Sequence, residues 1–301
     1  MTKLKCSIGV IAFNEEQNIG NVLRALLSQR LDEVEIGEII VVSSGSTDRT
    51  DVIVQGFVDR YSQIKLFLQP ERRGKSSAIN LFLSKAKYEI LVIESADTIP
   101  GRDTVEKLVS PFKNEQIGMS GGRPTPLNKK ESFVDFSVHL LWKMHHRLAM
   151  FRPKLGEMIA FRKVFSSIAE NSAVDEASIE ALITGTGLKC LYVSDAIVWN
   201  KGPETICEFI SQRKRIAIGH LWLKDNQNYL VSSSFKFLLF GLYLSECIDN
   251  PKDIIKITAA AGLELFCRFL GRIDYHIKKS NPFIWEMVRS SKNLETGNKD
   301  K

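Results

Sequence analysis

The sequence predicts an α/β fold built on a mostly parallel sheet, because two hydrophobic periods alternate along its first hundred residues. Short apolar runs without polar alternation are typical of strands buried on both faces. Between these runs, apolar residues recur every three or four positions, as on one face of a helix. The repeated order of strand, helix and strand favours crossovers that place helices on both faces of the sheet.

The individual elements follow from these runs and from their capping residues. We expect strands at residues 6–13, 38–42, 64–68 and 89–93. We expect helices at residues 19–27, from Asp48 with a cap at Ser46 or Thr47, and at residues 79–86. Ligands bind such sheets at the carboxyl ends of the strands, so the four loops after these strands are the first places to look for chemistry.

Beyond residue 100 the pattern is looser. We expect a turn at 121–124, a helix at 132–150, strands at 157–161 and 190–193, a helix at 176–184, and helices from Thr205 onward. We therefore predict a sheet domain over residues 1–204 and a helical C-terminal region over residues 205–301. The last ten residues are polar, and we expect them to be disordered.

The composition is that of an ordinary globular protein: 44 % of the 301 residues are hydrophobic and 25 % are charged. These values exclude collagen-like and largely disordered chains. The five cysteines lie far apart without a C-x-x-C spacing, which favours a reducing, cytoplasmic environment over a zinc site or a disulfide framework. The N-terminus lacks the long apolar segment and cleavage site of a signal peptide.

The positive charge is concentrated in the last third of the chain. Residues 1–200 carry 25 basic and 24 acidic side chains, whereas residues 201–301 carry 16 and 11. Two apolar stretches in this region, 237–245 and 254–273, are too short or too interrupted by charges for a conventional membrane span. They fit an interfacial pair of helices at an anionic membrane surface, or equally a pair packed on a soluble domain.

The common nucleotide-binding motifs are absent or incomplete. The sequence has no G-x-G-x-x-G, which is the fingerprint of a dinucleotide-binding fold. Gly74-Lys75-Ser76 resembles the end of a phosphate-binding P-loop, but the first glycine of that motif would fall at Gln69.

Four other segments, in order, resemble the family 2 glycosyltransferases, nearest the branch of cellulose and hyaluronan synthases. The segments are V-I-A-F-N-E-E at 10–16, I-V-V-S-S-G-S-T-D-R-T at 40–50, R-G-K at 73–75 with S-A-D at 95–97, and Q-R-K-R at 212–215. The resemblance covers about residues 5–220 and implies a GT-A fold, a three-layer sandwich around a mostly parallel sheet.

The resemblance also implies an activity. Relatives of this kind transfer a sugar, with inversion, from a nucleotide-diphosphate sugar of the UDP or GDP type to a hydroxyl group of a glycan or lipid-linked acceptor. They use Mg²⁺ or Mn²⁺ and serve glycan or cell-envelope synthesis at the cytoplasmic face of a membrane. We expect no nucleic-acid partner.

The family pattern assigns roles to particular residues of this chain. Asp97 follows the apolar strand at 89–93 and would bind the metal, because a cation that bridges a pyrophosphate needs a carboxylate at a fixed strand end. The donor would be bound by Ala12, Phe13, Glu15, Ser44, Lys75, Ser95, Gln212 and Arg215. Inverting transfer also needs a general base, which the resemblance assigns to the pair Asp175 and Glu176. Acidic residues at this place also suit a helix N-terminus, and the choice between the two members stays open.

The chain departs from the family pattern at several positions. Ser95 replaces the first aspartate of D-x-D, Ser43 and Ser44 replace the two aspartates of the second loop, and Ile216 replaces a tryptophan. The three serines keep open a nucleotide-sugar-binding protein without catalysis. A nucleotidyltransferase is a second alternative, although its glycine-rich loop is missing after the first strand.

His145 and His146 are the only adjacent histidines in the sequence. Neighbouring residues on a helix point about 100° apart, which is unsuitable for sharing one metal ion. We expect both on the surface or in an acceptor groove.

Overall fold

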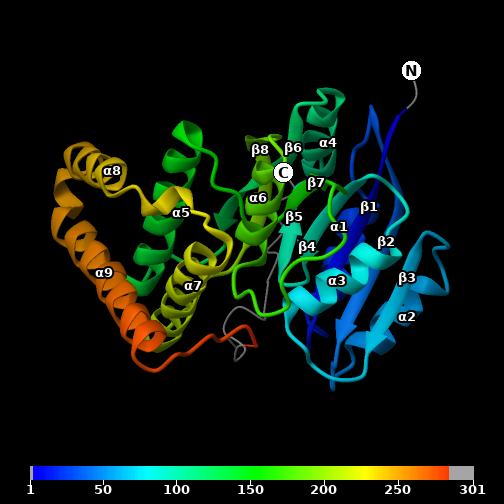
Figure 1. Ribbon diagram of the computed structural model, residues 1–301, viewed down its shortest axis with the longest axis horizontal. Helices are drawn as coiled ribbons and strands as arrows, with labels where there is room; N and C mark the ends of the chain where they lie inside the picture. Colours follow the sequence, from blue (N-terminus) through cyan, green and yellow to red (C-terminus); the bar gives the residue numbers. More distant parts are fainter. Residues whose placement is uncertain (1–2, 285–301) are drawn as a thin grey trace.

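Eight strands form one sheet in the computed structural model of the protein, which describes residues 3–284 (Figure 1). The strands are β1 (Leu4–Ala12), β2 (Val34–Ser44), β3 (Ile64–Gln69), β4 (Ile90–Ser95), β5 (Thr98–Pro100), β6 (Ile117–Pro126), β7 (Ile159–Arg162) and β8 (Lys189–Asn200). Their order across the sheet is β3-β2-β1-β4-β7-β6-β8-β5. The pairs β1–β2, β1–β4, β2–β3 and β6–β8 are parallel, which confirms the expected mostly parallel sheet.

Helices cover both faces of this sheet. They are α1 (Ile19–Leu27), α2 (Thr50–Val58), α3 (Lys75–Lys85), α4 (Thr104–Val109), α5 (Phe133–Phe151), α6 (Asp175–Gly185), α7 (Ile206–Gln227), α8 (Lys236–Asp249) and α9 (Ile254–His276), with short 3₁₀ turns at Ser110–Lys113, Ser232–Ser234 and Pro251–Asp253. One core cluster joins the sheet to α1, α2 and α4, and another joins it to α3 and α6. The result is a three-layer sandwich.

The close fit of α3 on the sheet explains a glycine inside β1. A Cβ atom on Gly9 would lie 2.6 Å from the ring of Phe82, which is fully buried. The missing side chain therefore lets the helix approach the strand. Burial of a phenylalanine side chain stabilises the fold by about 1.5–3 kcal/mol.

The elements predicted for the first hundred residues are present, and the helix at 19–27 has the expected bounds. The second helix begins at Thr50, because Asp48, and neither Ser46 nor Thr47, accepts a hydrogen bond from the first helical N–H. The turn predicted at 121–124 is wrong, since these residues lie inside β6. Side chains on Gly121 and Gly122 would collide with Leu155 and with a backbone oxygen of β8, so this glycine pair serves close packing.

The strand order changes direction between β1 and β4. The chain runs outward from β1 to β2 and β3, and then returns to place β4 on the other side of β1. Just beyond β4, the N–H of Ala96 donates to the carbonyl of Ile11 in β1, 3.1 Å away. Crevices that bind ligands in open α/β sheets form at such a point, outside the carboxyl ends of the strands.

The C-terminal helices lie together with α5 at one end of the sheet (Figure 1). A small apolar cluster with Val138, Phe209 and Cys267 joins α5, α7 and α9. A Cβ on Gly271 of α9 would lie 2.8 Å from Ala217 of α7, so these two helices are in close contact. The domain boundary after residue 204 falls just before α7 and stays a prediction. The expected disordered tail lies outside the described residues.

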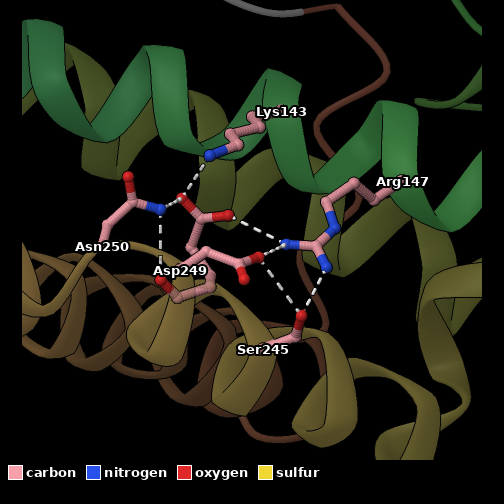
Figure 2. A network of polar contacts seen from close by, with 6 residues as sticks. Lys143, Arg147, Ser245, Asp249 and Asn250 are labelled. Atoms are coloured by element: carbon pink, nitrogen blue, oxygen red, sulfur yellow. Dashed lines mark hydrogen bonds and ion pairs between the residues drawn. The ribbon is translucent and has the colours of Figure 1, made fainter.

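A polar network fixes α8 to α5 (Figure 2). The buried carboxylate of Glu246 on α8 accepts from Lys143 (2.6 Å) and Arg147 (3.0 Å) on α5, and from the side chain of Asn250 (2.8 Å). Arg147 also donates to Ser245 at 2.7 Å. These charged contacts therefore lie on the inner side of α8, where Leu242 is also buried.

The outer side of α8 and α9 is apolar. Large exposed side chains on α8 recur at positions of one helix face, namely Phe237, Phe240, Leu244 and Ile248. On α9, Ile255, Leu265, Phe266 and Phe269 are also exposed. Within residues 3–284, no helix is both long enough and apolar enough to cross a membrane.

Candidate active site

A single cavity opens at the carboxyl ends of β1, β2 and β4 and extends between α5 and α7. All eleven residues to which the sequence analysis assigned a role line this cavity: Ala12, Phe13, Glu15, Ser44, Lys75, Ser95, Asp97, Asp175, Glu176, Gln212 and Arg215. They come from six separate parts of the chain. The segment after α9 returns to the same place and lines the cavity with Phe283 and Ile284 (Figure 1).

The loops after β1 and β2 are held together by hydrogen bonds. Asn14, in a left-handed backbone conformation, accepts from the N–H of Thr47 at 2.8 Å, and its own N–H donates to Ser46. The N–H of Glu15 donates to Thr50 at 2.7 Å. The two motifs that flank these strands thus form one rigid wall of the cavity.

The loop after β3 completes this wall. Gly45 has a φ of 69°, and a Cβ there would lie 2.6 Å from the backbone nitrogen of Arg72. The guanidinium of Arg72 stacks on the ring of Phe13, 4.0 Å from its centroid. An arginine held in this way offers a planar cation at the cavity edge.

The two serines that replace family aspartates differ in their surroundings. The hydroxyl of Ser43 donates to Ser46 at 2.9 Å. The hydroxyl of Ser44 is buried, lines the cavity, and has no hydrogen-bond partner among the described residues. Because a buried polar atom is costly when unpaired, Ser44 is suited to hydrogen-bond a ligand.

Three carboxylates gather at the end of β4. Glu94 is fully buried and accepts from Thr98 at 2.7 Å. Burial, followed by the charges of Glu157 and Asp97, raises the pKa of Glu94 to about 8. Glu157, with a φ of 57°, accepts from Asn200 at 3.0 Å. Burial and the neighbouring charges of Asp97 and Glu176 raise its pKa to about 7.

These oxygen atoms suit a hard divalent cation. Asp97 lines the cavity, and one oxygen of Glu94 has no hydrogen-bond partner within the described residues. No group of three histidine, cysteine, aspartate or glutamate side chains in residues 3–284 is arranged to hold a metal by itself. A cation here would therefore share its coordination between Asp97, ligand oxygens and water, as Mg²⁺ commonly does.

Lys75 joins the two halves of the cavity. It is the first residue of α3, and its ammonium lies 2.8 Å from Asp175 and 2.7 Å from Glu176, at the start of α6. Burial disfavours the charged lysine, but the two carboxylates outweigh this effect and raise its pKa. Burial and the charge of Glu176 raise the pKa of Asp175. Although burial opposes it, Lys75 holds the pKa of Glu176 below its ordinary value.

The far half of the cavity lies between α5 and α7. Trp142, His145, Lys154, Arg213 and His220 line it. The ring of Trp142 packs edge-on against His145, with centroids 5.3 Å apart. His145 is buried and so is not a surface residue, although it does line the groove. His146 points elsewhere, and its Nδ1 lies 2.9 Å from the hydroxyl of Tyr192.

Sequence reasoning missed three residues of this cavity: Arg72, Lys154 and Glu157. They stand in loops, and their place depends on contacts between distant segments, so no local signal marks them. Glu94 could be placed near Asp97 from the sequence, and in the structure it is fully buried at the end of β4.

The three-layer sandwich with its cavity at the switch point agrees with the expected GT-A glycosyltransferase fold. The family model described as Glycosyl transferase family 2 matches residues 7–171, more than half of the chain, and the chain therefore belongs to this family.

Two curated relatives extend this finding. A "Probable glycosyltransferase YdaM" of Bacillus subtilis is 27 % identical over 255 residues, covering 78 % of this chain and 57 % of that protein. A "Poly-beta-1,6-N-acetyl-D-glucosamine synthase" of Staphylococcus aureus is 24 % identical over 246 residues, covering 77 % and 58 %. The chain thus spans little more than half the length of these relatives.

Solved structures show the same fold. A mannosyltransferase from Pyrobaculum calidifontis, in complex with GDP-Man and Mn²⁺, aligns with a TM-score of 0.61 and 21 % identity over 93 % of this chain and 82 % of that chain. A glucosyl-3-phosphoglycerate synthase from Mycobacterium tuberculosis, with Mn²⁺, UDP and phosphoglyceric acid, aligns with a TM-score of 0.51 and 19 % identity over 73 % and 78 %.

The buried Glu94 leads to a testable pH dependence. An unfolded glutamate titrates near 4.5, whereas Glu94 titrates near 8 in the folded protein. Between these values the folded state binds more protons, so the free energy of unfolding falls as pH rises. In chelator-treated protein we expect Glu94 to contribute a fall of about 3 kcal/mol between pH 5 and 7.5, measured by urea denaturation. Glu94→Gln, which stays neutral, should remove this contribution and reduce the slope, whereas Glu115→Gln at an exposed site should not. Equal slopes in all three proteins would contradict the assignment.

Proposed function

We propose that the protein is an inverting glycosyltransferase that moves a sugar from a nucleotide-diphosphate sugar to a hydroxyl group of a glycan or lipid-linked acceptor. The observation that carries this proposal is the single cavity that contains a carboxylate cluster, a cationic edge and the Asp175–Glu176 pair. Family membership and the metal and nucleotide complexes of the structural neighbours support it.

The donor site occupies the half of the cavity next to β1, β2 and β4. Asp97 would hold Mg²⁺ or Mn²⁺, and the bound ion would neutralise charge that develops on the leaving nucleotide. Arg72 and Arg215 add positive charge on the same side. Ser44 hydrogen-bonds the base. Ser43 and Ser44 both lack the charge of the family aspartates, so UDP and GDP are both candidate nucleotides.

Asp175 and Glu176 act on the acceptor. A general base must take the proton of the attacking hydroxyl, and both carboxylates lie at the border of the two halves. The pKa of Asp175 is raised and that of Glu176 is lowered, so the pair holds one strongly ionised member beside a more basic one. This arrangement favours catalysis over a purely binding protein, and no glycine-rich loop of a nucleotidyltransferase follows β1.

The outer face of α8 and α9 contacts a membrane at its cytoplasmic surface. Phe237 is 94 % exposed and Ile255 is 84 % exposed, which is unusual for side chains of this size. The exposed lysines Lys252 and Lys256 lie beside Ile255 in sequence. Apolar side chains next to basic ones are typical of interfacial helices.

The metal role of Asp97 predicts a simple binding result. Asp97→Asn keeps the size of the side chain but removes the charge that a cation needs. We expect Mn²⁺ to tighten UDP or GDP binding at least tenfold in the natural protein and less than twofold in the variant, by calorimetry. Asp103→Asn, at an exposed carboxylate, is the control. A variant with unchanged metal dependence would refute the role of Asp97.

The base role of the pair predicts a separation of binding from turnover. Glu176→Gln and Asp175→Asn should each keep donor affinity within about threefold, while the variant that lacks the base loses at least 100-fold in kcat. Nucleotide release from a panel of UDP and GDP sugars measures both. Full turnover in both variants would exclude the pair as base.

The membrane contact predicts flotation with vesicles. The protein should float with anionic phosphatidylglycerol vesicles, and Phe240→Ser with Ile248→Ser should reduce the bound fraction at least fivefold. The matched control is Val52→Ser with Val164→Ser, which removes two exposed apolar side chains elsewhere. If the natural protein stays at the bottom of the gradient, the membrane contact is wrong.

A further inference from the structure

We propose that the half of the cavity between α5 and α7 binds a phosphate monoester group on the acceptor. The inference rests on the proposed function, because it assigns a substrate class to the acceptor side of the same site. It is carried by a set of cations that the donor does not use.

Lys154 is the centre of this set. It lies between α5 and β7, lines the cavity, and pairs with no carboxylate in the part of the chain that the structure describes. Burial, then the charges of Arg213 and Arg268, lower its pKa to about 7, although Glu264 and Glu180 act in the opposite direction. A partly buried ammonium that forms no ion pair is costly, and an anionic ligand would lower that cost.

The nearby positive charges are only partly compensated. Arg213 donates two hydrogen bonds of 2.8 Å to Glu264, and Arg268 donates one of 2.8 Å to the same carboxylate. One acidic group thus serves two guanidinium groups. Glu180 also faces this region, where it accepts from Tyr229 at 2.6 Å, and burial raises its pKa.

Two histidines complete the lining. His145 is 6 % exposed, and its Nδ1 has no hydrogen-bond partner within residues 3–284. Burial and the charges of Lys154 and Arg213 hold the pKa of His145 well below its ordinary value. His220, on α7, is affected in the same way by Lys154 and the two arginines. A dianion placed here would accept hydrogen bonds from the imidazoles and offset the excess charge.

This cationic group lies close to the proposed base. Glu180 follows Glu176 by four residues on α6, so their side chains share one helix face about 5–6 Å apart. The N–H of Leu155, next to Lys154, donates to Glu180. The spacing suits an acceptor whose phosphate lies a few bonds from the hydroxyl that attacks. A monoester fits better than a neutral sugar, because an anion also offsets the positive charges of Lys154 and its neighbours Arg213 and Arg268.

The test measures binding of inorganic phosphate to full-length protein that is already saturated with UDP or GDP and Mg²⁺. The nucleotide occupies the pyrophosphate site, so heat measured on phosphate addition reports a second site. Lys154→Gln should weaken phosphate binding at least tenfold, and Lys154→Arg should retain it. Lys224→Gln, on the exposed side of α7, should bind phosphate like the natural protein. Melting temperatures confirm that each variant is folded.

A second arm identifies the source of the phosphate. Glycerol 3-phosphate, but not glycerol, should stimulate nucleotide release from sugar donors if the acceptor is water-soluble. Lysophosphatidic acid, which carries a phosphate monoester and a free hydroxyl, should do so in phosphatidylcholine vesicles, and vesicles without it should not, if the phosphate belongs to a lipid. Either response supports the proposal when Lys154→Gln abolishes it.

The failures are separable. If nucleotide and Mg²⁺ bind but phosphate does not, or binds Lys154→Gln and Lys224→Gln alike, the acceptor proposal is overturned while the glycosyltransferase proposal stands. If nucleotide does not bind while phosphate binding still depends on Lys154, the glycosyltransferase proposal is overturned, and the phosphate site remains without a role as an acceptor site.

Discussion

The buried contact of Lys75 with Asp175 and Glu176 is the interaction on which the site depends. It joins the start of α3 to the start of α6, a hundred residues later in the chain. Asn80 strengthens the same junction, because its side chain exchanges two hydrogen bonds with the backbone of Ile168. A lone lysine or a lone carboxylate would be expensive at this depth, so the three groups stabilise the cavity only together.

The charges of the cavity are separated along its length. Carboxylates dominate at the end of β4, where Glu94 and Glu157 have raised pKa values, and cations dominate between α5 and α7, where the pKa of Lys154 is lowered. Burial is the largest cause of all three pKa shifts, and neighbouring charges of the same sign enlarge them. Each end therefore favours a ligand of opposite charge, and Lys75 balances the two carboxylates between the ends.

The sheet domain could be predicted because its signals are local. Periodic apolar residues mark each strand and helix, and the loop motifs follow directly from strand ends. The pair Gly121 and Gly122 could not be placed in β6 in this way, because these glycines are needed where Leu155 and β8 pack closely against the strand. The same holds for Lys154 and Glu157, whose neighbours come from α6, α7 and β8. The metal candidate Asp97 and the base candidates Asp175 and Glu176 could be predicted only because they lie in segments that resemble family motifs.

The C-terminal helices have an inner side next to the cavity and an apolar outer side. On the inner side, Arg213 of α7 lines the cavity and donates to Glu264 of α9. The inner side of α8 is held to α5 by the carboxylate of Glu246 (Figure 2), and Leu242 of the same helix is buried. Other apolar residues of α8, with Phe237 foremost, are left at the surface, where water opposes their exposure. A helix that is held by charged contacts and still exposes large apolar side chains is unusual, and this combination is the reason for proposing a membrane contact.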